Sequence, residues 1–347
     1  MDRITGAIKK AIENKASDIH LSQGSPPILR INGELIKTEF SSLENEIIEK
    51  FINDIGTPLL LNEYKEKGEA DFAHLIFQQR FRINIFRERC KNAVTMRLIN
   101  EEIPDIDKMG MPEVFKELSK KKNGLILVTG PTGSGKSTTM AAIINEINKN
   151  ERRHIITLED PIEYIFENNK SLIKQREVNV DTRSFSSGVR ASLRQDPDVI
   201  LVGEMRDFET ISAAIMAAET GHLVISTLHT LGATKTIDRI IDVFPPHQQG
   251  QIRSQLAMTL EGVISQVLLK DITNNGRVAA YEIMLANHAI RNLIREGKTH
   301  QLQNVIQTNA KSGMISMDMY LNNLVKEKKI TQETASEYIK EEFIFTN

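Results

Sequence analysis

The sequence contains a single cysteine, Cys90, which excludes an internal disulfide and a zinc site built from several cysteines. A reducing cytoplasm is therefore the simplest setting for the chain. Long apolar runs are missing as well, since none approaches the roughly 20 residues that a transmembrane helix requires. The segment Met1–Lys15 is charged throughout and lacks the pattern of a secretory signal. We therefore expect no direct membrane insertion, and any membrane association would go through a protein partner.

A strong charge of either sign is also missing, because the formal net charge is −2 over 347 residues. No global field therefore draws the chain to nucleic acid or to an anionic membrane surface. A DNA translocase is disfavoured for this reason, since phosphate contacts need basic stripes, and no nucleic-acid partner is expected. The hydrophobic content of 40% and the charged content of 26% are typical of a globular protein with an ample core.

The N-terminal part of the chain predicts a mixed α+β domain. Helical patterns cover 4–12, 43–53 and 58–66, and strand patterns cover 18–21, 28–31, 34–37, 69–76, 80–86 and 93–99. Asn32-Gly33 is typical of a tight hairpin turn. A linker is expected from Pro104 to Pro112.

The remainder alternates strand and helix patterns, which predicts a parallel sheet of the α/β class. Strands are expected at 125–129, 154–158, 199–202, 222–227 and 276–284, and helices at 137–148, 184–193, 208–219, 233–241 and 247–261. The run 263–269 is apolar, and three or four helices are expected from Ala289 onward.

The stretch GPTGSGKST, residues 130–138, matches the Walker A pattern G-x-x-x-x-G-K-[ST] between a predicted strand and a predicted helix. Its glycines let backbone N–H groups close around a phosphate, and the helix N-terminus adds partial positive charge. We expect Lys136 to reach the β- and γ-phosphates and the Ser137 hydroxyl to ligate Mg²⁺. The expected nucleotide-binding residues are Gly130, Pro131, Thr132, Gly133, Ser134, Gly135, Lys136, Ser137 and Thr138.

Acidic residues follow two further strand patterns. Glu204 comes after the buried strand 199–202, at the carboxyl end where open α/β sheets bind ligands. It can orient the Mg²⁺ shell or polarise water, although the usual Walker B aspartate is absent. In TLEDPIEY, residues 157–164, Glu163 is the preferred candidate for the general base. Glu159 and Asp160 stand beside a proline, so a turn role for them is an equal alternative.

Two histidines flank the strand pattern in GHLVISTLHT, residues 221–230. The spacing places His222 and His229 near the ends of the sheet, where His229 could sense the γ-phosphate. A purely structural role is an equal alternative for these side chains. Neither is expected to bind a metal, because no further His or Cys accompanies them.

Arginines alternate with apolar residues in two strand patterns of the first domain. Arg82 lies within RFRINIF, residues 80–86, and Arg97 points away from the apolar side chains of residues 93–99. The residues alone favour a solvated face. The functional alternative is that these arginines reach the phosphates of a neighbouring subunit, where such a contact raises the rate by orders of magnitude.

Four stretches in this order resemble the secretion-ATPase family of P-loop NTPases, namely GPTGSGKST, TLEDPIEY, VILVGEMRD and GHLVISTLHT. Within that family the chain is similar to the ATPases that retract type IV pili in twitching motility. Further stretches carry this similarity: 16–35, 175–198, 236–245 and AIRNLIRE at 289–296. The resemblance covers nearly the whole chain.

The resemblance implies a PAS-like domain over 1–100, a flexible linker over 101–112 and a RecA-like ATPase domain with C-terminal helices over 113–347. It further implies a homohexamer that uses ATP and Mg²⁺ at the cytoplasmic face of the inner membrane, docked on a pilus platform protein. Segment 87–92 departs from the Gly-rich turn expected for the family.

By this resemblance Glu163 belongs to an acidic box, Glu204 to Walker B, and His222 and His229 to a histidine box. Arg82 and Arg97 match positions that act on ATP from the first domain. AIRNLIRE matches a motif associated with retraction, and its helical spacing predicts a buried stripe with Arg291 and Arg295 outward.

The runner-up function is a motor for pilus extension or type II secretion. Those relatives usually carry a four-cysteine zinc insert, which this sequence lacks, and AIRNLIRE also favours retraction. A regulator that binds ATP without useful turnover is a third possibility. The combination of Lys136, Glu163 and Glu204 argues against it.

Overall fold

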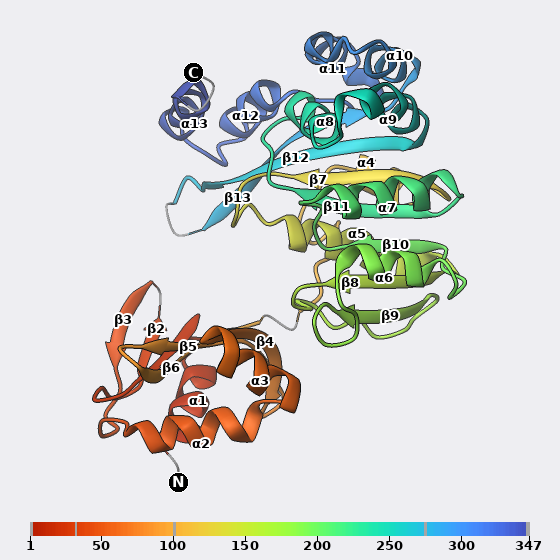
Figure 1. The fold of residues 1–347 in the computed structure, drawn as a ribbon. Helices are drawn as coiled ribbons and strands as arrows, with labels where there is room; N and C mark the ends of the chain where they lie inside the picture. The colour runs from red at the N-terminus through yellow and green to blue at the C-terminus, as the bar shows by residue number, and fades with distance from the viewer. Residues whose placement is uncertain (1–2, 32, 100–101, 274–275, 345–347) are drawn as a thin grey trace. The chain divides into compact units, whose positions relative to one another are not determined.

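The computed structural model describes residues 3–31, 33–99, 102–273 and 276–344. The chain divides into two compact units, whose elements are drawn in Figure 1. The first comprises Met1–Glu102 together with Asp160–Ile165, and the second comprises Ile103–Glu159 together with Phe166–Asn347.

The described part of the first unit is built on a six-stranded antiparallel sheet in the order β3-β2-β1-β6-β5-β4. Its strands are β1 (Asp18–Ser22), β2 (Ile28–Ile31), β3 (Glu34–Lys37), β4 (Glu69–Ile76), β5 (Gln79–Glu88) and β6 (Lys91–Leu98), and its helices are α1 (Arg3–Glu13), α2 (Asn45–Ile55) and α3 (Pro58–Lys67). Because side chains alternate across a strand, Ile19 and Met96 share one face and form a core with Ile48 of α2. The predicted α+β domain is confirmed.

Two hairpins of this sheet, β4–β5 and β5–β6, close through two-residue turns. Arg89 and Cys90 join β5 to β6 with φ angles of 50° and 64°, and Phe77 and Gln78 join β4 to β5 with 53° and 64°. Such left-handed pairs usually contain glycine or asparagine, because a non-glycine residue there costs about 1–2 kcal/mol. The hairpin at segment 87–92 therefore forms without the Gly-rich turn. In the turn predicted at Asn32-Gly33, Asn32 lies outside the described residues.

Of the strands described, seven form the sheet of the second unit, in the order β13-β12-β7-β11-β10-β8-β9. Their bounds are β7 (Gly124–Thr129), β8 (His154–Glu159), β9 (Leu172–Glu177), β10 (Val199–Val202), β11 (Leu223–Leu228), β12 (Leu260–Lys270) and β13 (Arg277–Leu285). All neighbours pair in parallel except β12 and β13. The predicted parallel sheet is confirmed. The prediction missed β9, an edge strand whose charged Lys174 and Arg176 hide the apolar signal.

Helices cover both faces of this sheet (Figure 1). The described helices of this unit are α4 (Val114–Ser119), α5 (Lys136–Asn150), α6 (Phe185–Ser192), α7 (Phe208–Glu219), α8 (Ala233–Asp242), α9 (Pro246–Thr259), α10 (His288–Glu296), α11 (Leu302–Thr308), α12 (Met317–Lys326) and α13 (Gln332–Ile344). Of these, α10 and α11 pack on α9 and α8, respectively, and α13 packs on α12. Ile126 of β7 packs in a core with α4 and α5, and the next residue, Leu127, packs with α7, α8 and α9. Ile106 and Met111, inside the segment expected to be a linker, are buried in the α4–α5 core.

No helix within the described ranges is both long enough and apolar enough to span a lipid bilayer.

Helix α10 contains the whole AIRNLIRE stretch, and its packing corrects one expectation. Its apolar stripe is buried, but Arg291 does not point outward. The guanidinium of Arg291 donates to the carbonyl oxygens of Ala257 and Met258 at the end of α9 and pairs with Glu261, each at 2.8 Å. The last carbonyl groups of a helix lack intrahelical partners, so they attract a cation. Arg295 is exposed, as predicted.

Candidate active site

The Walker A loop connects β7 to α5 and follows a backbone path that requires glycine. Gly130 has a φ of 146°, and a Cβ atom there would lie 2.2 Å from the carbonyl oxygen of Gln266. Gly135 caps the start of α5 with a φ of 85°. The loop therefore wraps tightly in front of the helix N-terminus, where unpaired N–H groups attract an anion.

Lys136 lies folded under this loop. Its Nζ atom donates hydrogen bonds of 2.9 Å to the carbonyl oxygens of Gly130 and Pro131, and the residue is only 9% exposed. The hydroxyl of Ser134 is also buried, and it has no hydrogen-bond partner within the described part of the chain. An ammonium group, a buried hydroxyl and a helix N-terminus around one turn fit the phosphates of a nucleotide.

Gln266 of β12 supports the loop from below, which the sequence analysis missed. Its Oε1 atom accepts from the Thr139 hydroxyl at 2.6 Å, and its Nε2 atom donates to the carbonyl oxygen of Ser134 at 2.5 Å. The residue is 1% exposed. A glutamine inside the otherwise apolar run 263–269 was the available signal, because a buried polar side chain needs partners.

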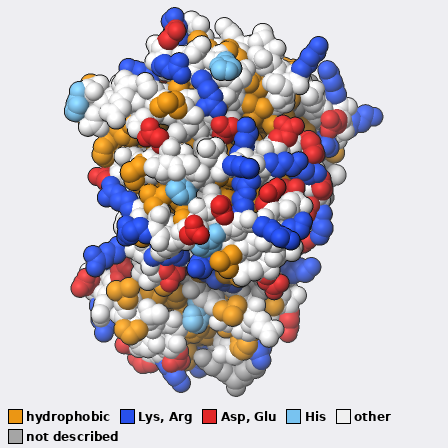
Figure 2. All heavy atoms as spheres, turned by 90° about the vertical axis from the view of Figure 1, so that its right-hand side faces the viewer, with side chains coloured by type: hydrophobic (Ala, Val, Ile, Leu, Met, Phe, Trp, Pro, Cys, Tyr) orange, Lys and Arg blue, Asp and Glu red, His pale blue; other side chains and the backbone are white. Residues whose placement is uncertain are grey.

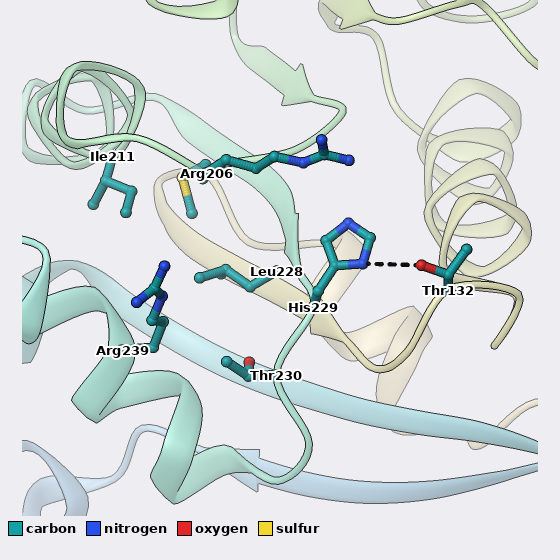
Figure 3. Close-up of a pocket in the computed structure, with 8 residues that line it drawn as sticks. Thr132, Arg206, Ile211, Leu228, His229, Thr230 and Arg239 are labelled. Carbon is teal, nitrogen blue, oxygen red and sulfur yellow. Dashed lines mark hydrogen bonds between the residues drawn. The ribbon is translucent and has the colours of Figure 1, made fainter.

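Glu204 and His229 meet the Walker A loop at the carboxyl edge of the sheet. They follow the neighbouring parallel strands β10 and β11, which place them side by side. Their Oε2 and Nε2 atoms lie 3.5 Å apart, and the Nδ1 atom of His229 lies 3.5 Å from the Thr132 hydroxyl (Figure 3). Arg206 pairs with Glu204 at 2.7 Å. Residues from three predicted motifs thus lie within contact distance of one another.

A pocket of about 450 Å³ lies beside this group. Arg206, Arg239 and His229 line it together with apolar side chains that include Ile211 and Leu228 (Figure 3). Neither arginine was among the site residues predicted from the sequence. Arg206 stands in VGEMRD two residues after Glu204, but Arg239 lies on α8 and only the fold brings it here. Two guanidinium groups and an imidazole make this pocket suitable for an anionic group.

The acidic box begins at the end of β8. The Oε1 atom of Glu159 accepts from the hydroxyl of Thr157 at 2.6 Å and from Nε2 of Gln175 at 3.1 Å, which suits a structural role. Glu163 lies in the segment Asp160–Ile165, which groups with the first unit, and it is half-buried. The structure therefore gives Glu159 partners on β8 and β9, whereas Glu163 is grouped with the first unit.

His222 lies at the other end of β11, away from the Walker A loop. Its Nδ1 atom is 3.0 Å from the carbonyl oxygen of Ala217 and 3.2 Å from the hydroxyl of Thr220, at the end of α7. These contacts are local and suit a structural residue. The structure brings His229 to the Walker A loop but not His222, because one precedes the strand and the other follows it.

Arg82 and Arg97 lie directly opposite each other on β5 and β6. Like charges in that position repel, and each guanidinium is instead paired with a carboxylate: Arg97 Nε lies 2.9 Å from Asp18, and Arg82 Nη2 lies 2.5 Å from Asp71. The hydrogen bonds that Arg82 donates to the Asp71 carboxylate raise the pKa of Arg82. Burial alone would raise the pKa of Asp18, but hydrogen bonds from Ser17 and Arg97 outweigh it and lower that pKa. The sequence had not revealed these ion pairs.

The described residues contain no group of three or more His, Cys, Asp or Glu side chains suited to hold a metal ion. The expected Mg²⁺ does not need such a group, because a nucleotide supplies phosphate oxygens as ligands. The Ser137 hydroxyl in the first turn of α5 and the Glu204 carboxylate at the end of β10 are both oxygen donors. That donor chemistry fits Mg²⁺.

Comparison with known proteins agrees with these motifs. Residues 2–334 match the family model described as type II/IV secretion system protein. The chain is 46% identical over 338 residues to the type IV pilus retractation ATPase PilT of Pseudomonas aeruginosa, covering 97% of this chain and 98% of that protein. It is 46% identical over 310 residues to a twitching motility protein of Neisseria gonorrhoeae, covering 89% of this chain and 83% of that protein.

The fold leads to the same family. A crystal structure of the pilus retraction motor PilT with bound ADP matches with a TM-score of 0.90 and 48% identity, covering 96% of each chain. The expected fold class, a P-loop ATPase domain preceded by a smaller α+β domain, is confirmed by this match. The chain belongs to the type II/IV secretion system protein family.

Proposed function

We propose that the chain is an ATP-hydrolysing motor that powers the retraction of type IV pili. The observation that carries the enzymatic part is the meeting of Thr132, Glu204 and His229 at the edge where the Walker A loop leaves the sheet. The pilus part rests on similarity over nearly the full length to a pilus retraction ATPase, whose solved counterpart binds ADP.

In the proposed reaction, Lys136 and the N–H groups at the start of α5 bind and orient the phosphates of ATP. Mg²⁺ held by Ser137 and Glu204 would neutralise charge that develops between the β- and γ-phosphates. Glu163 polarises the attacking water as general base. His229, placed between Thr132 and Glu204, senses whether the γ-phosphate is present.

The motor is proposed to work as a homohexamer at the cytoplasmic face of the inner membrane. A pilus platform protein would attach it there, as the family resemblance implies. Hydrolysis would rotate one unit against the other about the connection before Ile103, since Ile106 and Met111 already belong to the second core.

Deletion of the gene in its host tests the direction of the motor. A retraction motor predicts cells with excess pili and no twitching, because extension continues without disassembly. Electron microscopy would count surface pili, and a copy of the wild-type gene should restore the normal number. Bald cells would instead support the runner-up, a motor for extension or secretion.

Nucleic acid remains a disfavoured substrate. On the face that Figure 2 shows, basic and acidic side chains are interspersed. A protein that follows a phosphate backbone instead aligns its cations in a groove or stripe. ATP turnover by the purified protein should therefore be unaffected by added DNA.

Arg97→Ala is expected to remove most of the ATPase activity of the full-length protein. We propose that Arg82 and Arg97 stabilise the charge on ATP in the transition state from a neighbouring subunit or across the hinge, as the family resemblance implies. Arg30→Ala is the matched control, because Arg30 also faces Asp18, at 3.9 Å, from the neighbouring strand. Steady-state phosphate release measures both variants.

Rings that mix Arg97→Ala and wild-type subunits show which subunit supplies the arginine to the bound ATP. Arg97→Ala subunits should regain hydrolysis when wild-type neighbours supply the guanidinium, and they should stay inactive if it acts within one chain. If Arg97→Ala is no slower than Arg30→Ala, the arginines form only a solvated face.

A further inference from the structure

Helix α8 starts without a capping side chain of its own. Its N-cap residue, Gly232, has a φ of 81° and no side chain to offer. Two distant side chains replace it: the Ser265 hydroxyl accepts from the Gly232 N–H, and the Glu282 Oε1 atom accepts from the Ala233 N–H, each at 2.8 Å. Ser265 and Glu282 are directly opposite each other on β12 and β13. A cross-strand pair thus holds the first N–H groups of the helix.

Burial of the Glu282 carboxylate at the start of α8 costs free energy. The residue is 5% exposed, and a buried carboxylate is tolerated only when hydrogen bonds and opposite charge compensate for lost water. The positive end of α8 supplies part of this compensation. The remaining oxygen, Oε2, accepts from Nε2 of Gln303 on α11 at 3.1 Å. One carboxylate oxygen of Glu282 therefore contacts the start of α8, and the other contacts α11.

The start of α8 is also tied to the active-site loops. Gly232 follows His229 by three residues along the chain. The buried hydroxyl of Thr236 lies 2.7 Å from that of Thr230 and donates to the carbonyl oxygen of Gly232 at 2.8 Å. It is 3.5 Å from the hydroxyl of Thr129, the residue just before the Walker A loop. A shift of α8 would therefore move the His229 loop relative to the phosphate-binding loop.

We propose that Glu282 is a positioning residue for ATP hydrolysis. It holds the amino end of α8, and this fixes His229 on the preceding loop and Arg239 on the helix beside the pocket. Through Gln303 it also links α11 to that geometry. The inference rests on the proposed ATPase function, and it adds a residue that touches neither nucleotide nor reacting atoms.

Glu282→Gln tests the charge without changing the size of the side chain. We expect kcat to fall about tenfold or more, because small displacements of active-site groups have effects of this order. KM and ADP affinity should stay within about threefold of wild type, since the Walker A loop remains intact. Asn287→Ala is the control: it removes the cap of α10, an Asn287 Oδ1 contact of 3.0 Å, without touching α8. Its kcat should be close to that of wild type.

Exchanging the residues at positions 282 and 303 distinguishes a positioning role of the Glu282 charge from a role in packing alone. The double variant Glu282→Gln/Gln303→Glu restores a carboxylate–amide pair but moves the charge away from α8. We expect its thermal unfolding midpoint to recover while kcat stays low. Recovery of kcat in the swap, or a Glu282→Gln enzyme as fast as Asn287→Ala, would overturn the proposal. If Glu282→Gln does not fold, Ser265→Ala provides the measurement, and an unchanged kcat there has the same meaning.

The activity of Lys136→Ala distinguishes a failure of the positioning role of Glu282 from a failure of the ATPase function. A dead Lys136→Ala enzyme with a fully active Glu282→Gln enzyme removes only the positioning role. An active Lys136→Ala enzyme removes the ATPase assignment itself.

Discussion

Lys136→Ala is expected to abolish Mg²⁺-dependent ATP hydrolysis while the protein remains folded. The substitution removes the ammonium group that would contact the β- and γ-phosphates, and with it the hydrogen bonds to the carbonyl oxygens of Gly130 and Pro131. We expect a loss of at least about 10³-fold, the upper end of what a single transition-state donor contributes. Phosphate release at saturating ATP measures the rate, and circular dichroism checks the fold.

Lys149→Ala is the matched control for this prediction. Lys149 lies at the far end of the same helix, α5, where it pairs with Asp105 at the surface. Its loss should leave hydrolysis near the wild-type rate. Turnover at the wild-type rate in Lys136→Ala would remove the Walker A assignment, and equal losses in both variants would point to a damaged helix.

Glu204→Gln and Glu163→Gln should each still bind ATP but hydrolyse it at least about 10²-fold more slowly, as loss of a positioned base or charge would cause. Glutamine keeps the size of the side chain and removes its charge. At position 204 it also deprives Arg206 and His229 of their carboxylate partner. Binding is measured with a fluorescent nucleotide, and the chemical step is measured in single turnovers.

Glu159→Gln belongs in the same experiment as the control from the acidic box. Its carboxylate accepts from Thr157 and Gln175, so we expect a modest loss of stability and little change in the hydrolytic step. Among the other two acids, a variant that binds ATP and cleaves it at the normal speed is not the base. A Glu159→Gln enzyme with the largest defect would reassign the base to the end of β8.

Local sequence patterns predicted the parts of the site that local geometry determines. The Walker A loop needs only a strand, a glycine-rich turn and a helix in succession, so nine adjacent residues carried the prediction. Glu204 and His229 could be placed together because carboxyl ends of parallel strands share one edge. The sequence order puts His222 before the same strand, but it did not reveal the contacts that His222 makes with Ala217 and Thr220 at the end of α7.

Contacts between distant segments were beyond such patterns. Gln266 on β12 contacts the Walker A loop, and Glu282 on β13 contacts the start of α8. Both lie far along the chain from these partners, and the residues around them in the sequence do not indicate the contacts. Arg291 appeared to face outward because helical spacing describes only its own helix, whereas its partners are at the end of α9. Edge strand β9 was missed since exposure on one side replaces apolar residues with charged ones.

The hydrogen bonds of Arg291 change how mutants of the AIRNLIRE stretch should be interpreted. Loss of this guanidinium would leave Glu261 with Lys121 as its remaining cation, at 2.7 Å, and would release the end of α9. A retraction defect in such a mutant would therefore reflect the loss of the contact between α10 and the end of α9 inside the motor. It would not show that α10 binds a pilus protein. Arg295 lies exposed on the same helix, so it is the residue to change when binding of a pilus protein is tested.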